Sequence, residues 1–192
     1  MSSKSFRQIL QVPDSTASTS DSALIIIDAQ NEYASGALTV TNASSSRAAI
    51  TSLLSKYRKA GGKIVHVKHS VPEGAPVFTP GTELAEEFKE LKPEDGEEVI
   101  TKLFPGSFTE TTLDEYLKKI GTKKVVLCGY MAHVCVSTTA REAYQKGYEV
   151  ILVEDAIGDR NIPGASGDDV TKMVLLELND VFGTVVKSRD VK

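Results

Sequence analysis

The sequence predicts an α/β fold in which a parallel sheet carries helices on both faces. Two observations point to this fold. Short apolar segments alternate along the chain with segments of helical periodicity, and the central apolar segments run without polar interruption. Strands of a parallel sheet are buried on both faces, so they appear as continuous apolar runs. The 192 residues suit one domain with a sizeable core.

The first half of the chain begins with residues 1–22, which are polar and Ser/Thr-rich, and we expect them to form a loose leader. The domain, 23–192, opens with the run ALIIID at 23–28, a strand buried on both faces. The next elements are a helix at 44–59 that ends at two glycines, an alternating β-branched strand at 63–68, an ordered Pro/Gly-rich loop at 70–81, a short helix at 84–91 and a strand at 98–102.

The second half continues the alternation of strands and helices. The predicted elements are a helix at 111–120 ended by Gly121, a strand at 124–128, a helix from Cys135 to a stop at Gly147, a buried strand at 149–154, a loop at 158–167, a helix at 168–179 and a last strand at 181–186. We find no repeat, linker or second domain.

Composition excludes several classes of partner. A net charge of -4 gives no reason to expect nucleic acid or an anionic membrane surface. No apolar run approaches the roughly 20 residues of a membrane span. The chain has two cysteines and no apolar segment typical of a signal peptide, so we expect reduced thiols and a cytoplasmic location, without excluding unconventional secretion.

Three chemically reactive side chains follow predicted strands. Asp28 closes the first strand, Lys102 follows the strand near 98–101, and Cys135 opens the helix after the strand at 124–128. Ligands of open α/β sheets bind beyond the carboxyl ends of the strands. We therefore predict that these three residues meet in one crevice.

Such a trio has a definite chemistry. A helix N-terminus and a nearby ammonium lower the pKa of a thiol, which makes Cys135 a candidate nucleophile. Asp28 could accept the thiol proton and pass it to a leaving group, while Lys102 keeps the carboxylate ionised and aimed. Each residue also has an ordinary structural interpretation. Asp28 could be a turn or capping residue, Lys102 a solvated surface charge and Cys135 a small buried side chain. Their joint placement at one sheet edge favours the functional one.

Three segments resemble the isochorismatase-like cysteine hydrolases, the family of isochorismatases, nicotinamidases and N-carbamoylsarcosine amidohydrolases. They are IIDAQNEY at 26–33, TKLFPGSF at 101–108 and GYMAHVCVSTTAREA at 129–143, and they occur in the family's order of Asp, Lys and Cys. The resemblance covers roughly residues 20–187. It implies a three-layer α-β-α fold with a six-stranded, parallel, Rossmann-like sheet, and a homo-oligomer, either dimer or tetramer.

The resemblance also implies details of the site. The catalytic residues would be Asp28, Lys102 and Cys135, and a cis peptide bond would join Tyr130 to Met131. The N–H groups of Met131 and Cys135 would form an oxyanion hole. Met131 replaces the Thr or small residue common at its position, which makes the pocket floor more apolar. Candidate substrate-binding residues are Gln30, Tyr33, His69, Phe78, Phe104, Tyr130 and His133.

The sequence gives no support for a cofactor or a metal. No dinucleotide- or nucleotide-binding glycine motif is present. Nicotinamidases of the family often hold a metal with an Asp-x-His pair, but here the stretch from His66 to His69 lacks the Asp. These two histidines are three apart on a strand and point to opposite faces. His69 and His133 each have an alternative structural role.

Two reactions compete for this site, and both suit a small cyclic or aromatic substrate. In hydrolysis of the isochorismate vinyl ether, Asp28 would donate a proton and Cys135 would be dispensable. In hydrolysis of an amide, Cys135 would form an acyl-enzyme. We favour isochorismate hydrolysis narrowly, with a metal-independent amidohydrolase of the nicotinamidase or carbamoyl-amide type next. A third possibility, from another class, is a catalytically idle binding protein.

Overall fold

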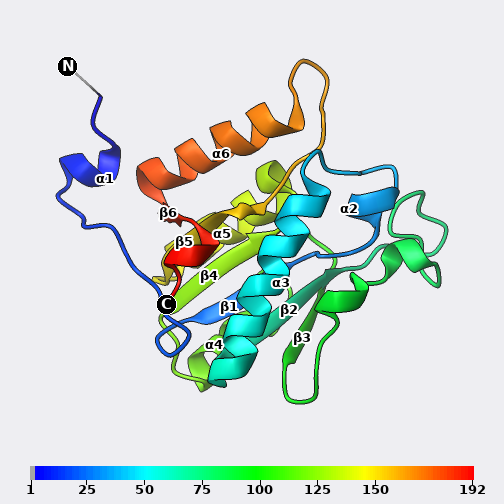
Figure 1. Cartoon of the computed structure of the whole chain (residues 1–192), viewed down its shortest axis with the longest axis horizontal. Helices are drawn as coiled ribbons and strands as arrows, with labels where there is room; N and C mark the ends of the chain where they lie inside the picture. The colour runs from blue at the N-terminus through cyan, green and yellow to red at the C-terminus, as the bar shows by residue number, and fades with distance from the viewer. Residues whose placement is uncertain (1–2) are drawn as a thin grey trace.

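Six parallel strands form the central sheet, in the order β3-β2-β1-β4-β5-β6. A computed structural model describes residues 3–192 of the chain. The strands are β1 (Ala23–Ile27), β2 (Lys63–His69), β3 (Glu98–Lys102), β4 (Lys124–Gly129), β5 (Glu149–Ile157) and β6 (Thr184–Val186). Every strand pairing is parallel, which confirms the predicted fold class (Figure 1).

Helices cover both faces of this sheet. They are α1 (Phe6–Ile9), α2 (Glu32–Ser35), α3 (Ala43–Ala60), α4 (Leu113–Lys119), α5 (Ser137–Gln145) and α6 (Gly167–Val181). The long helix α3 lies across one face, as Figure 1 shows. Side chains of α4, α5 and α6 pack together in the core cluster on the other face.

The strand β1 shows how the sequence builds two cores. Ile25 and Ile27 belong to the cluster that α4, α5 and α6 cover, whereas Leu24 and Ile26 belong to the cluster under α3. Successive side chains of a strand point to opposite faces, so an uninterrupted apolar run fills both layers. All five residues of β1 are buried. This central strand therefore fixes the position of Asp28, the residue that follows it.

The predicted helix at 84–91 is wrong. Two short 3₁₀ turns, Glu83–Ala85 and Lys89–Leu91, stand there instead. Between them the backbone pairs with the segment after β1, because Asn31 N donates to Glu86 O and Phe88 N donates to Ala29 O. These long-range hydrogen bonds override the local helical periodicity. The last strand is also shorter than predicted, because α6 continues to Val181 and β6 begins at Thr184.

The segment before β1 is fastened to the domain rather than loose. Ser5 caps α1, and the side chain of Arg7 is 8% exposed. Its guanidinium donates to Gly183 O and to Thr184 Oγ1, at the start of β6. The polar leader is therefore anchored by one buried arginine.

Within residues 3–192, no helix combines the length and the apolar composition that crossing a membrane requires.

Candidate active site

The three reactive residues predicted to meet do lie together. Asp28 follows β1, Lys102 ends β3, and Cys135 follows β4 within the π-helical turn Ala132–Val136. Lys102 Nζ is 2.8 Å from Asp28 Oδ2 and 3.3 Å from Cys135 Sγ. The exposed fractions are 0% for Asp28, 1% for Lys102 and 4% for Cys135. The predicted crevice is thus a nearly closed site at the carboxyl ends of β1, β3 and β4.

Asp28 has an unusual backbone. Its φ is +50°, in the left-handed region that aspartate tolerates better than most residues. Its N–H donates to Val67 O of β2 at 2.8 Å. The chain therefore turns away from β1 at a residue that is still hydrogen-bonded to the neighbouring strand. The buried Oδ1 accepts no hydrogen bond from the residues that the structure describes. That oxygen is available to exchange a proton with Cys135 or with a substrate.

Burial controls the protonation of this carboxyl group. Desolvation raises the pKa of Asp28, and the positive charge of Lys102 offsets only part of that effect. For Lys102 the balance is reversed: burial favours the neutral amine, but Asp28 and Cys135 raise its pKa overall. Lys102 is therefore charged, and Asp28 can hold a proton more readily than an exposed aspartate.

The ammonium of Lys102 has a full set of partners. Besides Asp28 and Cys135, it lies 3.1 Å from Phe104 O and 3.2 Å from His69 Nδ1. Burial and the adjacent Lys102 charge lower the pKa of His69 to about 4, so its ring is neutral at physiological pH. A neutral imidazole can accept a hydrogen bond from the ammonium at Nδ1. His69 thus helps to hold Lys102 in place.

The expected lowering of the Cys135 pKa is wrong for this structure. Desolvation and the negative charge of Asp28 raise the pKa of the Cys135 thiol, and Lys102 counteracts only part of this rise. Burial of the sulfur outweighs the effect of the helix N-terminus. The resting side chain is therefore a thiol, and it must lose its proton as it reacts.

The turn before Cys135 has the expected backbone. The peptide bond between Tyr130 and Met131 is cis. The Met131 N–H makes no hydrogen bond with the described residues, and the Cys135 N–H has no backbone acceptor outside its own helical turn. Their role as an oxyanion hole stays a prediction.

Two aromatic rings close the site from the other side. Phe78 packs edge-on against Tyr33 and His69, with ring centroids 5.3 Å and 5.2 Å apart. Phe78 has a φ of +49°, which is rare for a bulky residue. The buried carboxylate of Glu32 accepts the Phe78 N–H at 3.2 Å and so holds this conformation. Phe78, Tyr33 and His69 thus form an aromatic cluster beside Lys102.

The other predicted pocket residues have different surroundings. The side-chain amide of Gln30 donates to His69 O and Ala85 O and accepts the His69 N–H. These bonds hold together the backbone around the site. Tyr130 is fully buried, and its hydroxyl is 2.7 Å from Ser46 Oγ. Phe104 is 42% exposed and contributes its carbonyl oxygen rather than a buried ring.

His133 is fixed by a residue that the sequence analysis missed. Asp159, at 0% exposure, accepts both the His133 N–H at 2.8 Å and its Nδ1 at 2.7 Å. The carboxylate of Asp159 thereby orients the imidazole within the turn Ala132–Val136, two residues before Cys135. Among residues 3–192, no group of three or more His, Cys, Asp or Glu side chains is arranged to hold a metal ion.

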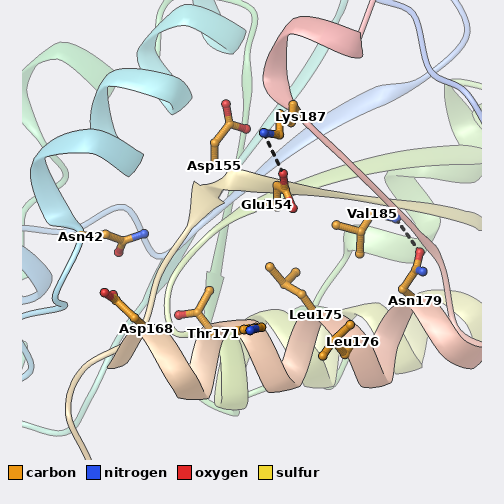
Figure 2. A pocket seen from close by; sticks show the side chains of 11 residues that line it. Asn42, Glu154, Asp155, Asp168, Thr171, Leu175, Leu176, Asn179, Val185 and Lys187 are labelled. Atoms are coloured by element: carbon orange, nitrogen blue, oxygen red, sulfur yellow. Dashed lines mark hydrogen bonds and ion pairs between the residues drawn. The ribbon is translucent and has the colours of Figure 1, made fainter. Parts of the chain in front are cut away.

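A groove of about 710 Å³ lies away from these residues. Figure 2 shows it between α6 and the last strands, where Lys187 lies 3.6 Å from Glu154 and Val185 N donates to Asn179 Oδ1 at 3.0 Å. No member of the Asp28–Lys102–Cys135 trio lines it. Groove size is thus a poor guide to the chemistry here, and the closed site must open to admit a substrate.

Residues 22–190 match the isochorismatase domain family. The chain belongs to this family of hydrolases. Across 187 residues it is 59% identical to the secreted isochorismatase effector Isc1 of Verticillium dahliae, covering 97% of this chain and 98% of that protein. This isochorismatase-family hydrolase is therefore similar to a named isochorismatase over nearly its whole length.

Solved structures agree with this assignment. A Pseudomonas putida isochorismatase superposes with a TM-score of 0.95 at 33% identity, covering 100% of both chains. An N-carbamoylsarcosine amidase from Thermoplasma acidophilum superposes with a TM-score of 0.77 at 28% identity, covering 90% of this chain and 99% of the other. Proteins named as an isochorismatase and as an amidase thus share the fold of this chain.

Proposed function

We propose that this isochorismatase-family hydrolase cleaves the vinyl ether of isochorismate, giving 2,3-dihydroxy-2,3-dihydrobenzoate and pyruvate. The observation that carries the proposal is the buried Asp28 carboxyl, whose pKa is raised by desolvation beside a cationic lysine. Vinyl-ether hydrolysis begins with protonation of a carbon atom, and a carboxyl group with a raised pKa carries a proton more readily than an exposed aspartate does. The high identity to the Verticillium isochorismatase supports the same substrate.

The reaction proceeds in three steps. Asp28 transfers its proton to the terminal CH₂ carbon of the enolpyruvyl group, and the electron pair of the C=C bond forms the new C–H bond. Water adds to the resulting oxocarbenium carbon and loses a proton to Asp28, which gives a hemiketal. The hemiketal C–O bond to the ring then breaks: the hemiketal hydroxyl loses its proton and becomes the carbonyl of pyruvate, and that proton passes to the departing ring oxygen. Lys102 holds Asp28 in place and attracts a substrate carboxylate.

Amide hydrolysis is the second candidate, and the position of Cys135 favours it. Its sulfur lies 3.3 Å from Lys102 Nζ, close enough for the ammonium to stabilise a forming thiolate. Asp28 would take the thiol proton as sulfur attacks the carbonyl carbon, then give it to the departing amine. Water would release the acyl group from Cys135. Met131 and Cys135 N–H groups would hold the oxyanion in both steps.

Two substitutions separate these candidates. Purified Asp28→Asn and Cys135→Ala variants should be assayed on isochorismate, nicotinamide and a panel of small cyclic amides. The proposal requires that isochorismate is turned over, that Asp28→Asn abolishes turnover, and that Cys135→Ala retains most of it. Loss of all activity in Cys135→Ala would establish the acyl-enzyme route. No turnover of any compound by the unmodified protein would favour the idle binding protein.

We further propose a small cyclic substrate seated against Tyr33, Phe78 and Met131, with no metal or cofactor, and a homo-oligomer of two or four chains. Light scattering on the purified protein tests the assembly, and a monomeric mass would contradict it. The cytoplasmic location stays a prediction, because the Verticillium relative is named a secreted effector. Immunoblotting of culture medium against cell lysate would decide it.

A further inference from the structure

A buried pair of hydroxyl groups joins the loop after β3 to helix α5. Thr139 Oγ1 accepts the Ser107 N–H at 3.1 Å and lies 2.8 Å from Ser107 Oγ. Both residues are 0% exposed. Buried polar groups without partners are costly, so each hydroxyl depends on the other. This contact belongs to neither the proton transfer nor the oxyanion hole described above.

A second contact lies one helical turn further along α5. The Glu142 carboxylate accepts the Phe108 N–H at 3.1 Å and the Thr109 hydroxyl. The loop passes so close that a Cβ added to Gly106 would lie 2.3 Å from the carboxylate. Only glycine permits this approach without a shift of the neighbouring side chain. Thr139 and Glu142 together thus hold the loop segment 106–109, and we refer to these two residues as the clamp.

The clamp joins the loop that follows Lys102 to the helix that follows Cys135. At the start of the loop, Phe104 O accepts a hydrogen bond from Lys102 Nζ at 3.1 Å. Leu103 and Phe104 are 64% and 42% exposed, so packing does little to fix this stretch. On the helix side, Cys135, Thr139 and Glu142 are spaced i, i+4 and i+7, which places them along one face.

We propose that Thr139 and Glu142 are positioning residues, which tie the Lys102 loop to the helix that follows Cys135 and so set the separation between the ammonium and the sulfur. The proposal rests on the role given above to Lys102, which holds Asp28 in both candidate reactions, and not on the identity of the substrate. It also gives a physical reason for two motif segments, the Gly-Ser-Phe of 106–108 and the Thr-Ala-Arg-Glu of 139–142.

The test variant is Thr139→Val, which keeps the shape of the side chain and removes its hydroxyl. Thr138→Val is the matched control, because the neighbouring threonine makes no side-chain hydrogen bond within the described chain. Thr139→Ser should restore the contact. Glu142→Ala tests the other half of the clamp and keeps the proposal testable where Thr139→Val does not fold.

The main readout is alkylation of Cys135 by iodoacetamide as a function of pH, followed by peptide mass spectrometry to separate it from Cys128. The charged and titratable groups facing the sulfur are Asp28, Lys102 and Tyr33, with His69 behind Lys102. When the ammonium shifts away, the thiolate loses its stabilising charge. The alkylation profile of Thr139→Val and of Glu142→Ala should therefore move to higher pH.

Turnover gives the second readout. Loss of one buried hydrogen bond corresponds to about a fivefold decrease in rate when it acts on the reacting groups. We expect a decrease of that size in kcat for Thr139→Val with little change in KM, recovery in Thr139→Ser and no change in Thr138→Val. An unmoved alkylation profile in Thr139→Val and Glu142→Ala would overturn the proposal, even with a lowered melting temperature. Because alkylation needs no substrate, this result is independent of whether isochorismate is cleaved.

Discussion

Removal of the Lys102 charge should destabilise the protein in a pH-dependent way. Lys102→Met keeps the length of the side chain but leaves Asp28 without its cation. Both side chains of the 2.8 Å ion pair are 0% exposed, so the relevant comparison is a broken buried pair, worth about 3–5 kcal/mol, rather than a surface pair worth less than about 1 kcal/mol. The variant should therefore lose a large part of a typical domain's stability.

The pH dependence follows from the sign of the Asp28 shift. Its pKa is already raised by burial, and it rises further without the lysine. A carboxyl group with a raised folded-state pKa stabilises the fold while protonated, and this contribution is lost as pH rises from the unfolded-state pKa through the folded-state pKa. The difference in unfolding free energy between Lys102→Met and the unmodified protein should thus be largest near pH 8 and smaller near pH 5.

Urea unfolding followed by far-UV circular dichroism at pH 5, 6, 7 and 8 measures this difference, since the chain has no tryptophan for fluorescence. The double variant Asp28→Asn/Lys102→Met is the control, because it removes the buried charge as well as its partner. It should recover most of the loss at pH 8. A loss that is equal at all four pH values, or a double variant as unstable as the single one, would refute the buried-charge reasoning.

Three further outcomes follow from the geometry. Gly129→Ala should cost at least about 2 kcal/mol, measured as the urea midpoint, because φ is 116° and an added Cβ would lie 1.9 Å from Ile27 O. Phe78→Ala should lose about 3–5 kcal/mol of stability yet alkylate faster at Cys135, since a closing ring is removed; slower alkylation would contradict the closing role. Glu97 precedes β3, and burial opposes its ionisation. Hydrogen bonds, chiefly from Arg58 of α3, nevertheless lower the pKa of Glu97 to about 2. Glu97→Gln should therefore destabilise at pH 7 and lose its effect as pH falls from about 4.5 towards 2, measured by thermal melts; an effect that persists at pH 2 would contradict this.

Much of the fold could be predicted because its signals are local. The run at 23–28 is apolar at every position but the last, and its short length and three isoleucines indicate a buried strand rather than a helix. The helix predicted at 84–91 was wrong because the hydrogen-bond partners of this segment are Ala29 and Asn31, more than fifty residues earlier. Local periodicity contains no information about such a partner.

Some residues of the site could be predicted from local sequence signals, and others could not. Asp28, Lys102 and Cys135 could be predicted because each follows a strand, and strand ends of a parallel sheet share one edge. Asp159 and Thr139 could not, because their importance lies in contacts with His133 and Ser107 made through ordinary residue types in loops or helices. The pKa of Cys135 was predicted in the wrong direction for a similar reason: burial depends on the whole fold.

The charge of the closed site connects the two candidate reactions. With Asp28 ionised, Lys102 charged and Cys135 a thiol, the trio has a net charge of zero, and transfer of the thiol proton to Asp28 leaves that sum unchanged. The thiolate is thus reached without adding charge to a buried site, which suits a neutral amide. When Asp28 instead enters the reaction protonated, the trio has a charge of +1, which a substrate carboxylate would balance. An anionic substrate therefore favours the form of the site that can donate a proton, and a neutral one favours the form that can ionise the thiol.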